Sequence, residues 1–187
     1  RRKGMVRGAD AQLYGRSRKA GSQAHGLRED DELIAVRENS GNSQGVLTTE
    51  NGMGIRLSCR DVRSMGRTAT GVKGIALRRG DNVVACVIMD QDDESATIMT
   101  VSNNGYGKRT RLELYRVQSR GGYGVINFKV TPKTGEVIGA MTVAENDALI
   151  LLTSTNKIIR IGVDDVRSVG RATQGVRLVA LDEEAFV

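Results

Sequence analysis

A repeat of about 52 residues restricts the fold more than any other feature of this sequence. The phrase at residues 62–73 returns in closely similar form at 166–177, and a looser copy lies midway at 115–125. A second phrase precedes each copy, at 51–56, 104–109 and 155–160. The first 50 residues hold a worn, that is degenerate, copy of the unit, at 3–7 and then at 16–21. Such a period indicates a repeat architecture, in which each unit buries its apolar surface against its neighbours.

The apolar runs inside the units are typical of strands rather than helices. They are short, rich in β-branched residues and bounded by Gly, Asn or Asp, as at 83–89, 137–143 and 148–153. Asn51-Gly52 and Asn104-Gly105 predict two-residue hairpin turns, because both turn positions tolerate a positive φ. Four strands in about 50 residues make a propeller blade. We therefore predict an all-β domain spanning 1–187, with about four blade units at about 1–50, 51–102, 103–154 and 155–187.

Composition excludes several other classes of protein. No apolar run is long enough for a transmembrane helix, and the first residues lead into no apolar stretch of a secretory signal. The two cysteines, Cys59 and Cys86, form neither a disulfide framework nor a metal-binding spacing. Lone His25 cannot supply a repeated catalytic dyad. We expect no metal, no cofactor, no catalytic residue and no membrane partner.

The net charge of +6 hides two opposed patterns along the repeat. The stretches 1–25, 56–79, 105–120 and 157–177 hold 24 of the 28 basic residues but only five of the 22 acidic ones. Equal positions in successive blades lie at equal places on the surface, so the basic residues are expected to form one continuous band and the acidic residues another.

A band made mostly of arginine suits phosphate oxygens, which guanidinium binds bidentately. Glycine beside the arginines, as at Gly66 and Gly170, leaves room for a phosphate to approach the backbone. Aromatic residues, at 3%, are too few for a platform that stacks single-stranded bases. The band therefore predicts sequence-tolerant binding of double-stranded DNA, which a curved array would bend.

Several long phrases resemble the C-terminal DNA-wrapping domain of the DNA gyrase A protein, and the similar domain of its topoisomerase IV counterpart. They are Asn104-Gly105-Tyr106-Gly107-Lys108-Arg109-Thr110 with Glu113-Leu114-Tyr115-Arg116, residues 62–72 and 166–176, and Asp31-Glu32-Leu33-Ile34. The resemblance implies a six-bladed β-pinwheel whose basic rim wraps a duplex and supports negative supercoiling. It also implies a bacterial cytoplasmic, nucleoid-associated protein that forms a homodimer and works with the ATPase partner of the same enzyme, the gyrase B protein. With about four units, the chain is expected to be a fragment of that domain.

The gyrase box of this family, a glutamine-led heptad rich in basic residues and glycine, has only a degenerate counterpart. It is Gln118-Ser119-Arg120-Gly121-Gly122-Tyr123-Gly124, in which Ser119 and Tyr123 replace basic residues. Its surroundings indicate a remnant in a later blade.

Other interpretations of the motifs stay open beside this one. A propeller that serves as a protein-interaction scaffold would use the acidic band for a basic partner. A propeller enzyme would need convergent catalytic residues that the sequence does not offer. Residues 66–73 resemble a phosphate-binding P-loop, but Val72 stands where lysine must follow glycine. Tyr106 and Tyr115 either flank DNA or pack in the blades.

The sequence thus predicts a non-catalytic module that binds, bends and wraps duplex DNA. Its phosphate-neutralising residues are expected to be Arg56, Arg63, Arg67, Lys73, Lys108, Arg109, Arg111, Arg116, Arg120, Lys157, Arg160, Arg167, Arg171 and Arg177.

Overall fold

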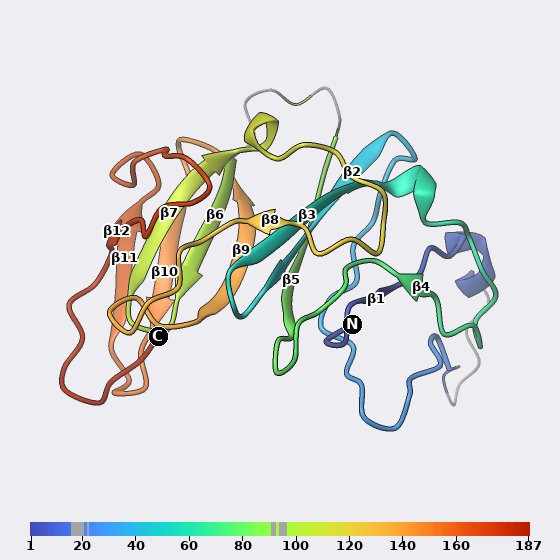
Figure 1. Ribbon diagram of the computed structural model, residues 1–187, viewed down its shortest axis with the longest axis horizontal. Coiled ribbons are helices and arrows are strands. Elements are labelled where there is room, and N and C mark those ends of the chain that lie inside the picture. The colour runs from blue at the N-terminus through green and yellow to red at the C-terminus, as the bar shows by residue number, and fades with distance from the viewer. Residues whose placement is uncertain (16–20, 22, 91–92, 94–96) are drawn as a thin grey trace.

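The computed structural model describes residues 1–15, 21, 23–90, 93 and 97–187. These residues form four antiparallel sheets with three short 3-10 helices and no α-helix, which confirms the predicted all-β class (Figure 1). Most of the worn repeat copy expected at 16–21 lies outside the described residues. The 3-10 helices are η1 (Ala11–Tyr14), η2 (Cys59–Asp61) and η3 (Leu112–Leu114).

Two of the sheets are four-stranded blades of identical design. The strand order is β5-β2-β3-β8 in the first and β12-β7-β6-β9 in the second. The strands of the first are β2 (Ser43–Thr49), β3 (Met53–Ser58), β5 (Val83–Asp90) and β8 (Val125–Ile126). Those of the second are β6 (Thr97–Ser102), β7 (Tyr106–Arg111), β9 (Val137–Val143) and β12 (Val176–Arg177).

The other two sheets each have two strands and repeat parts of the same design. The hairpin of β10 (Ala148–Leu152) and β11 (Ile158–Gly162) follows the β2–β3 and β6–β7 hairpins as a third copy. The pair of β1 (Met5–Val6) and β4 (Val72–Lys73) corresponds to the pairing of β3 with β8. The worn phrase at 3–7 is therefore a structural copy of the phrase at 51–56.

The hairpins form where the sequence predicts them, but with a wider turn. The Gly52 N–H donates to the Thr49 carbonyl, so Glu50 and Asn51 occupy the corners of the turn. Gly52 alone takes a positive φ, at 78°, whereas Asn51 does not. This combination of a turn with a following left-handed residue is a common hairpin connection. Gly105 and Asn156 take the same place in the next two copies, with φ of 77° and 59°.

Each blade is completed by a strand from the following repeat. Val125 of β8 pairs with Gly54 of β3, and Val176 of β12 pairs with Gly107 of β7. Each four-stranded sheet therefore combines residues from successive sequence units, which ties the repeats to one another.

Glycine permits the close approach that this exchange of strands needs. Gly71, Gly124 and Gly175 precede β4, β8 and β12, and all three have φ between 70° and 83°. A Cβ on Gly124 would lie 2.4 Å from the Gly54 carbonyl oxygen, and one on Gly175 would lie 2.3 Å from that of Gly107. The recurrence of glycine at this place is thus explained by backbone packing rather than by a ligand.

The core lies between the sheets and includes a buried polar cluster. Tyr115 is 0% exposed and donates its hydroxyl to Asn127 Oδ1, while Asn127 Nδ2 donates to Thr100 Oγ1 over 3.3 Å. Tyr106 is also buried. Of the two roles weighed for these tyrosines, packing inside the blades is the one they have here.

Candidate nucleic-acid interface

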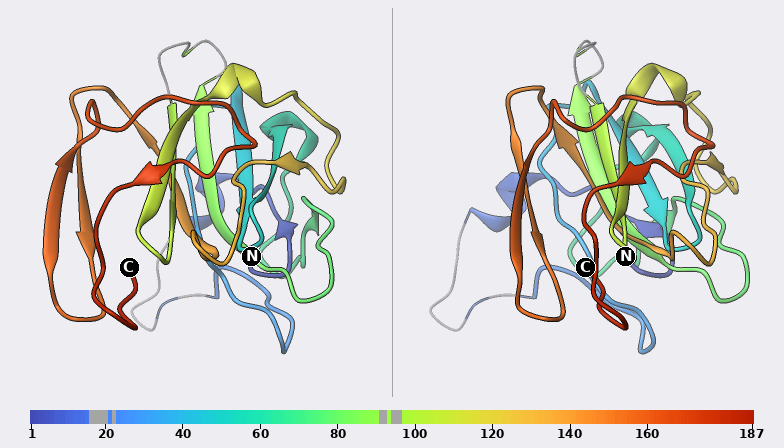
Figure 2. Two further views of the ribbon diagram at one scale, coloured as in Figure 1. Left: turned by 60° about the vertical axis from the view of Figure 1, so that its left-hand side comes forward. Right: turned by 90° about the vertical axis from the view of Figure 1, so that its left-hand side faces the viewer.

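Three loops present arginines at matching places in successive repeats. Each loop runs from the end of a hairpin to the short strand that completes the preceding blade, over residues 62–71, 115–124 and 166–175. The loops follow one another along one side of the fold, coloured from teal through yellow to red (Figure 1), and both views of Figure 2 show them on that same side. Each loop carries two arginines four residues apart, namely Arg63 and Arg67, Arg116 and Arg120, and Arg167 and Arg171.

Four of these six arginines are exposed, and no residue that the structure describes binds their guanidinium groups. Arg63, Arg116, Arg120 and Arg167 make no side-chain hydrogen bond or ion pair with any residue that the structure describes. Their charges are therefore available to a partner.

Arg67 and Arg171 are half-buried and tie their loops to neighbouring segments. Arg171 donates to the carbonyls of Leu114 and Ile126 in the preceding repeat, at 2.5 and 2.9 Å. Arg67 donates to the Leu13 carbonyl and lies over the Tyr14 ring, 5.7 Å from its centroid. Part of each guanidinium is thus bonded to the protein's own backbone.

Arg56 and Arg109, by contrast, point into the fold. Arg56 donates to the carbonyls of Leu112 and Tyr115, at 3.0 and 2.9 Å. Arg109 is 9% exposed and donates to the Val166 carbonyl at 2.5 Å. Both satisfy carbonyls where a loop leaves its hairpin, so the structure gives them a structural place instead of the expected place on the basic band.

Lys108 is the most deeply placed of the expected cations. Its side chain is 0% exposed, and its ammonium group donates to the carbonyls of Gly170, at 2.8 Å, and Arg171. Burial, together with the nearby charge of Arg171, lowers the pKa of Lys108 to about 7. In this position Lys108 cannot reach a phosphate on the surface.

The remaining expected cations are exposed, and three of them have partners. Arg111 pairs with Glu113 at 3.4 Å, and Lys157 pairs with Asp182 at 2.5 Å. Such exposed pairs are weak and leave the cation available to a competing anion. Arg177 donates to the Tyr106 hydroxyl over 3.4 Å. Lys73 and Arg160 have no side-chain partner among the described residues.

The degenerate heptad at 118–124 makes up the last seven residues of the middle arginine loop. Gln118 donates its backbone N–H to the Arg56 carbonyl, and Gly121 donates its own to the Gly74 carbonyl, so the loop is held at two points. Tyr123 is 60% exposed. This heptad thus occupies the same place as residues 65–71 and 169–175 of the neighbouring loops.

Arg7 holds the first arginine loop from within the fold, although it is not among the residues predicted from sequence. Its Nη1 donates to the carbonyls of Gly66 and Arg67, at 2.8 and 2.6 Å, just as Lys108 does in the third loop. The repeat alignment pairs the two residues, because Arg7 stands in the degenerate copy at the place of Lys108.

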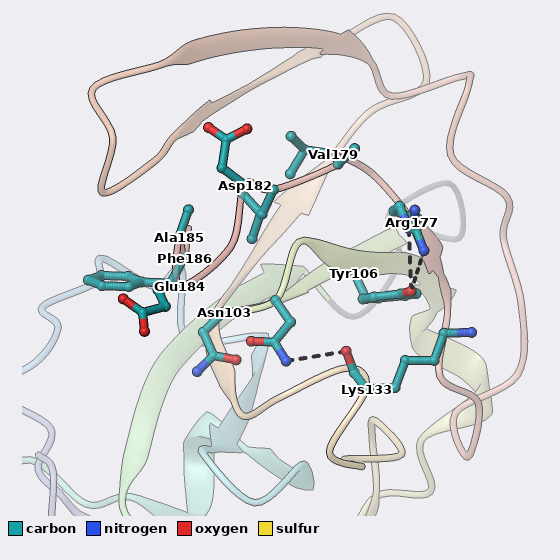
Figure 3. A pocket seen from close by; sticks show the side chains of 12 residues that line it. Asn103, Tyr106, Lys133, Arg177, Val179, Asp182, Glu184, Ala185 and Phe186 are labelled. Atoms are coloured by element: carbon teal, nitrogen blue, oxygen red, sulfur yellow. Dashed lines mark hydrogen bonds between the residues drawn. The ribbon is translucent and has the colours of Figure 1, made fainter.

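A cleft of about 650 Å³ opens on another part of the fold, beside β7 and the C-terminal segment (Figure 3). Tyr106 and Arg177 face one another in it, and Lys133 lies 5.6 Å from the centroid of the Tyr106 ring. Within the described residues, no three His, Cys, Asp or Glu side chains gather as metal ligands. Nor does any helix there have the length and apolar character to cross a membrane.

Known proteins resemble this chain over its whole length. It is 64% identical to the DNA gyrase A protein of Lawsonia intracellularis and 40% identical to that of Staphylococcus epidermidis, over 186 residues in each case. These matches cover 100% of this chain but only 23% and 21% of those proteins. The chain therefore spans less than a quarter of the length of these relatives.

Solved structures agree with the sequence relatives. The C-terminal domain of DNA topoisomerase IV matches 98% of this chain with a TM-score of 0.88 and 26% identity. The DNA gyrase A C-terminal domain matches 99% with a TM-score of 0.84 and 25% identity. This chain covers 56% and 61% of those two structures.

A family model, described as the DNA gyrase C-terminal domain, beta-propeller, matches residues 46–88, 96–144 and 147–187. Those three segments coincide with the repeats built around β2, β6 and β10. The chain belongs to the DNA gyrase C-terminal domain family.

Proposed function

We propose that this chain binds and bends double-stranded DNA as part of a bacterial DNA gyrase A protein, and that it thereby supports negative supercoiling. The observation that carries the proposal is the set of three arginine loops on one side of the fold. Arg63, Arg116 and Arg167 occupy the same place in the three loops and are all exposed. Charges repeated at one place in a curved array suit the phosphates of a duplex that follows the array.

The glycines beside the arginines support phosphate contact. Gly66 and Gly170 have no positive φ, and a Cβ on either would meet no atom within 4 Å. Nothing in the described fold therefore requires glycine at these places, unlike at Gly71 or Gly175. A group that must come close to the backbone from outside, such as a phosphate, is a physical reason for glycine here.

The identity of 64% to a gyrase A protein favours gyrase over topoisomerase IV as the parent enzyme. In such a parent the chain would belong to a protein that forms a homodimer and works with the ATPase partner, gyrase B, in the cytoplasm on the nucleoid. Strand passage would belong to other parts of that enzyme, and this segment would present the duplex.

The test is the salt dependence of duplex binding by a variant with Arg116→Glu and Arg167→Glu. Each phosphate contact contributes about 0.9 to the slope of log K against log salt, so losing two should lower the slope by about 1.8. The matched control carries Arg28→Glu and Arg37→Glu, which change the charge equally at exposed places outside the loops. Fluorescence anisotropy with a labelled duplex at several salt concentrations measures the slopes.

Equal slopes for the two variants would show that the loops are not the binding surface. Bending is read separately, from energy transfer between dyes at the two ends of the duplex. Binding by the wild-type chain should increase the transfer, and an unchanged transfer would contradict bending.

A further inference from the structure

A buried or half-buried cation lies beneath the arginine turn in two of the repeats. Lys108 donates to the carbonyls of Gly170 and Arg171 in the third loop. Arg7 donates to the carbonyls of Gly66 and Arg67 in the first loop. The two cations occupy equivalent places in the repeat, Lys108 within β7 and Arg7 directly after β1, so the arrangement is a repeated device and not an isolated contact.

Drawing these carbonyls inward turns the next N–H groups outward. In a trans peptide the C=O of one residue and the N–H of the next point in opposite directions, and the described chain has no cis peptide bond. The Gly170 and Arg171 carbonyls face Lys108, so the N–H groups of Arg171 and Ala172 face away from it. Neither N–H has a hydrogen-bond partner among the described residues.

The outer side of this turn has the properties of an anion seat. Two successive free N–H groups form a concave donor pair that binds phosphate oxygens. Ala172 is exposed, and Gly170 adds no side chain that would block the approach. Thr173 Oγ1 donates to the Gly170 carbonyl at 2.9 Å and helps to keep it turned inward.

We propose that Lys108 is a positioning residue that holds the turn at 170–172 as a seat for one duplex phosphate, bound by the N–H groups of Arg171 and Ala172. This rests on the proposed function, because it assumes that the loops meet DNA. Arg7 does the same for the turn at 66–68. The middle loop lacks the device, because Ile55 stands at the place of Lys108 and has no group to donate.

Amide NMR during titration of the whole 187-residue chain with a short DNA duplex tests the seat. The resonances of the Arg171 and Ala172 amide protons should shift downfield more than those of neighbouring residues, because new hydrogen bonds to phosphate deshield the protons. Inorganic phosphate alone should move the same two amides at higher concentration, which separates a general anion seat from one that needs the duplex. If the chemical shifts of these two amide protons change neither with duplex nor with phosphate, the proposal is overturned.

Variants test the role of Lys108. Lys108→Met should abolish the two amide shifts and weaken duplex binding about fivefold, whereas Lys108→Arg should restore both, because Arg7 already serves in this way. Ile55→Met introduces the same residue at the equivalent place in the middle repeat and should leave both amides unchanged. If Lys108→Met fails to fold, the Lys108→Arg variant and the wild-type titration still decide the matter.

The two proposals fail in different ways. If Arg116→Glu with Arg167→Glu lowers the salt slope but the two amides do not respond to the duplex, the positioning proposal is wrong and the function stands. If that double variant also leaves binding unchanged, both are wrong.

Discussion

Replacing Gly124 by alanine should strongly destabilise the protein, because it affects the place where one repeat completes the blade of another. Gly124 has a φ of 76°, a conformation that costs an L-residue about 1–2 kcal/mol. Its new Cβ would also lie 2.4 Å from the Gly54 oxygen and 2.8 Å from the Gly54 carbon, both in the backbone. Backbone atoms cannot rotate away, so β8 must move off β3. We expect a total cost of at least about 3 kcal/mol.

Two further glycines separate the contributions of conformation and contact. Gly80 has a φ of 81° but open space around its Cβ, so Gly80→Ala should cost only the conformational part, about 1–2 kcal/mol. Gly139, in β9, has neither a positive φ nor a close neighbour, so Gly139→Ala should change stability by less than about 0.5 kcal/mol. Urea unfolding followed by circular dichroism gives the three values on one scale.

The difference between Gly124 and Gly80 is the decisive measurement. If Gly124→Ala costs no more than Gly80→Ala, the close approach of β8 to β3 does not limit the fold. The glycine repeated before β4, β8 and β12 would then need another explanation.

Buried groups lead to three other expected outcomes. Tyr115→Phe removes the hydroxyl that donates to Asn127 and leaves a buried amide oxygen unsatisfied. It should therefore lower the free energy of unfolding, measured in urea, by about 1–3 kcal/mol. An unchanged free energy would contradict the buried hydrogen bond. Burial lowers the pKa of Lys108 to about 7 from an ordinary 10.5, so between these values the unfolded chain binds more protons and the folded state gains stability as pH rises. In Lys108→Met the stability should no longer rise with pH in this range. If the urea midpoints of the wild type and the variant follow parallel pH profiles, the lowered pKa of Lys108 is refuted. Burial, with a smaller effect of Cys86, raises the pKa of Cys59 to about 11 from 9.0. Its alkylation at pH 8 should therefore be about a hundredfold slower than that of a free thiol. Mass spectrometry of the labelled peptide gives the rate, and a rate equal to that of a free thiol would contradict the raised pKa.

Much of the fold could be predicted from sequence, because the copies of a repeat can be aligned with one another and so show which segments are equivalent. The recurrence of the phrase at 62–73 indicated equivalent segments, and short β-branched runs between turn residues indicated strands. The exchange of β8 and β12 between repeats was not accessible, since two-residue strands leave no periodicity to detect. The hairpin turns were predicted at the right places, but the wider turn depends on the register of Thr48 with Gly54, which only strand pairing sets.

Residue order was enough to establish a β-repeat with its basic residues at matching places in the units, because repetition and charge can be read along a chain. Which of those cations face outward depends on the folded arrangement. Arg116 and Arg167 reach the surface, whereas Lys108 and Arg109, two neighbours in the same basic phrase, are buried beneath the next loop. The physical reason is that each loop leaves carbonyl groups unpaired where it crosses the preceding strand, and buried carbonyls must find donors. A long cationic side chain in that strand supplies them, and no pattern in the sequence distinguishes it from a cation that is free to meet a phosphate.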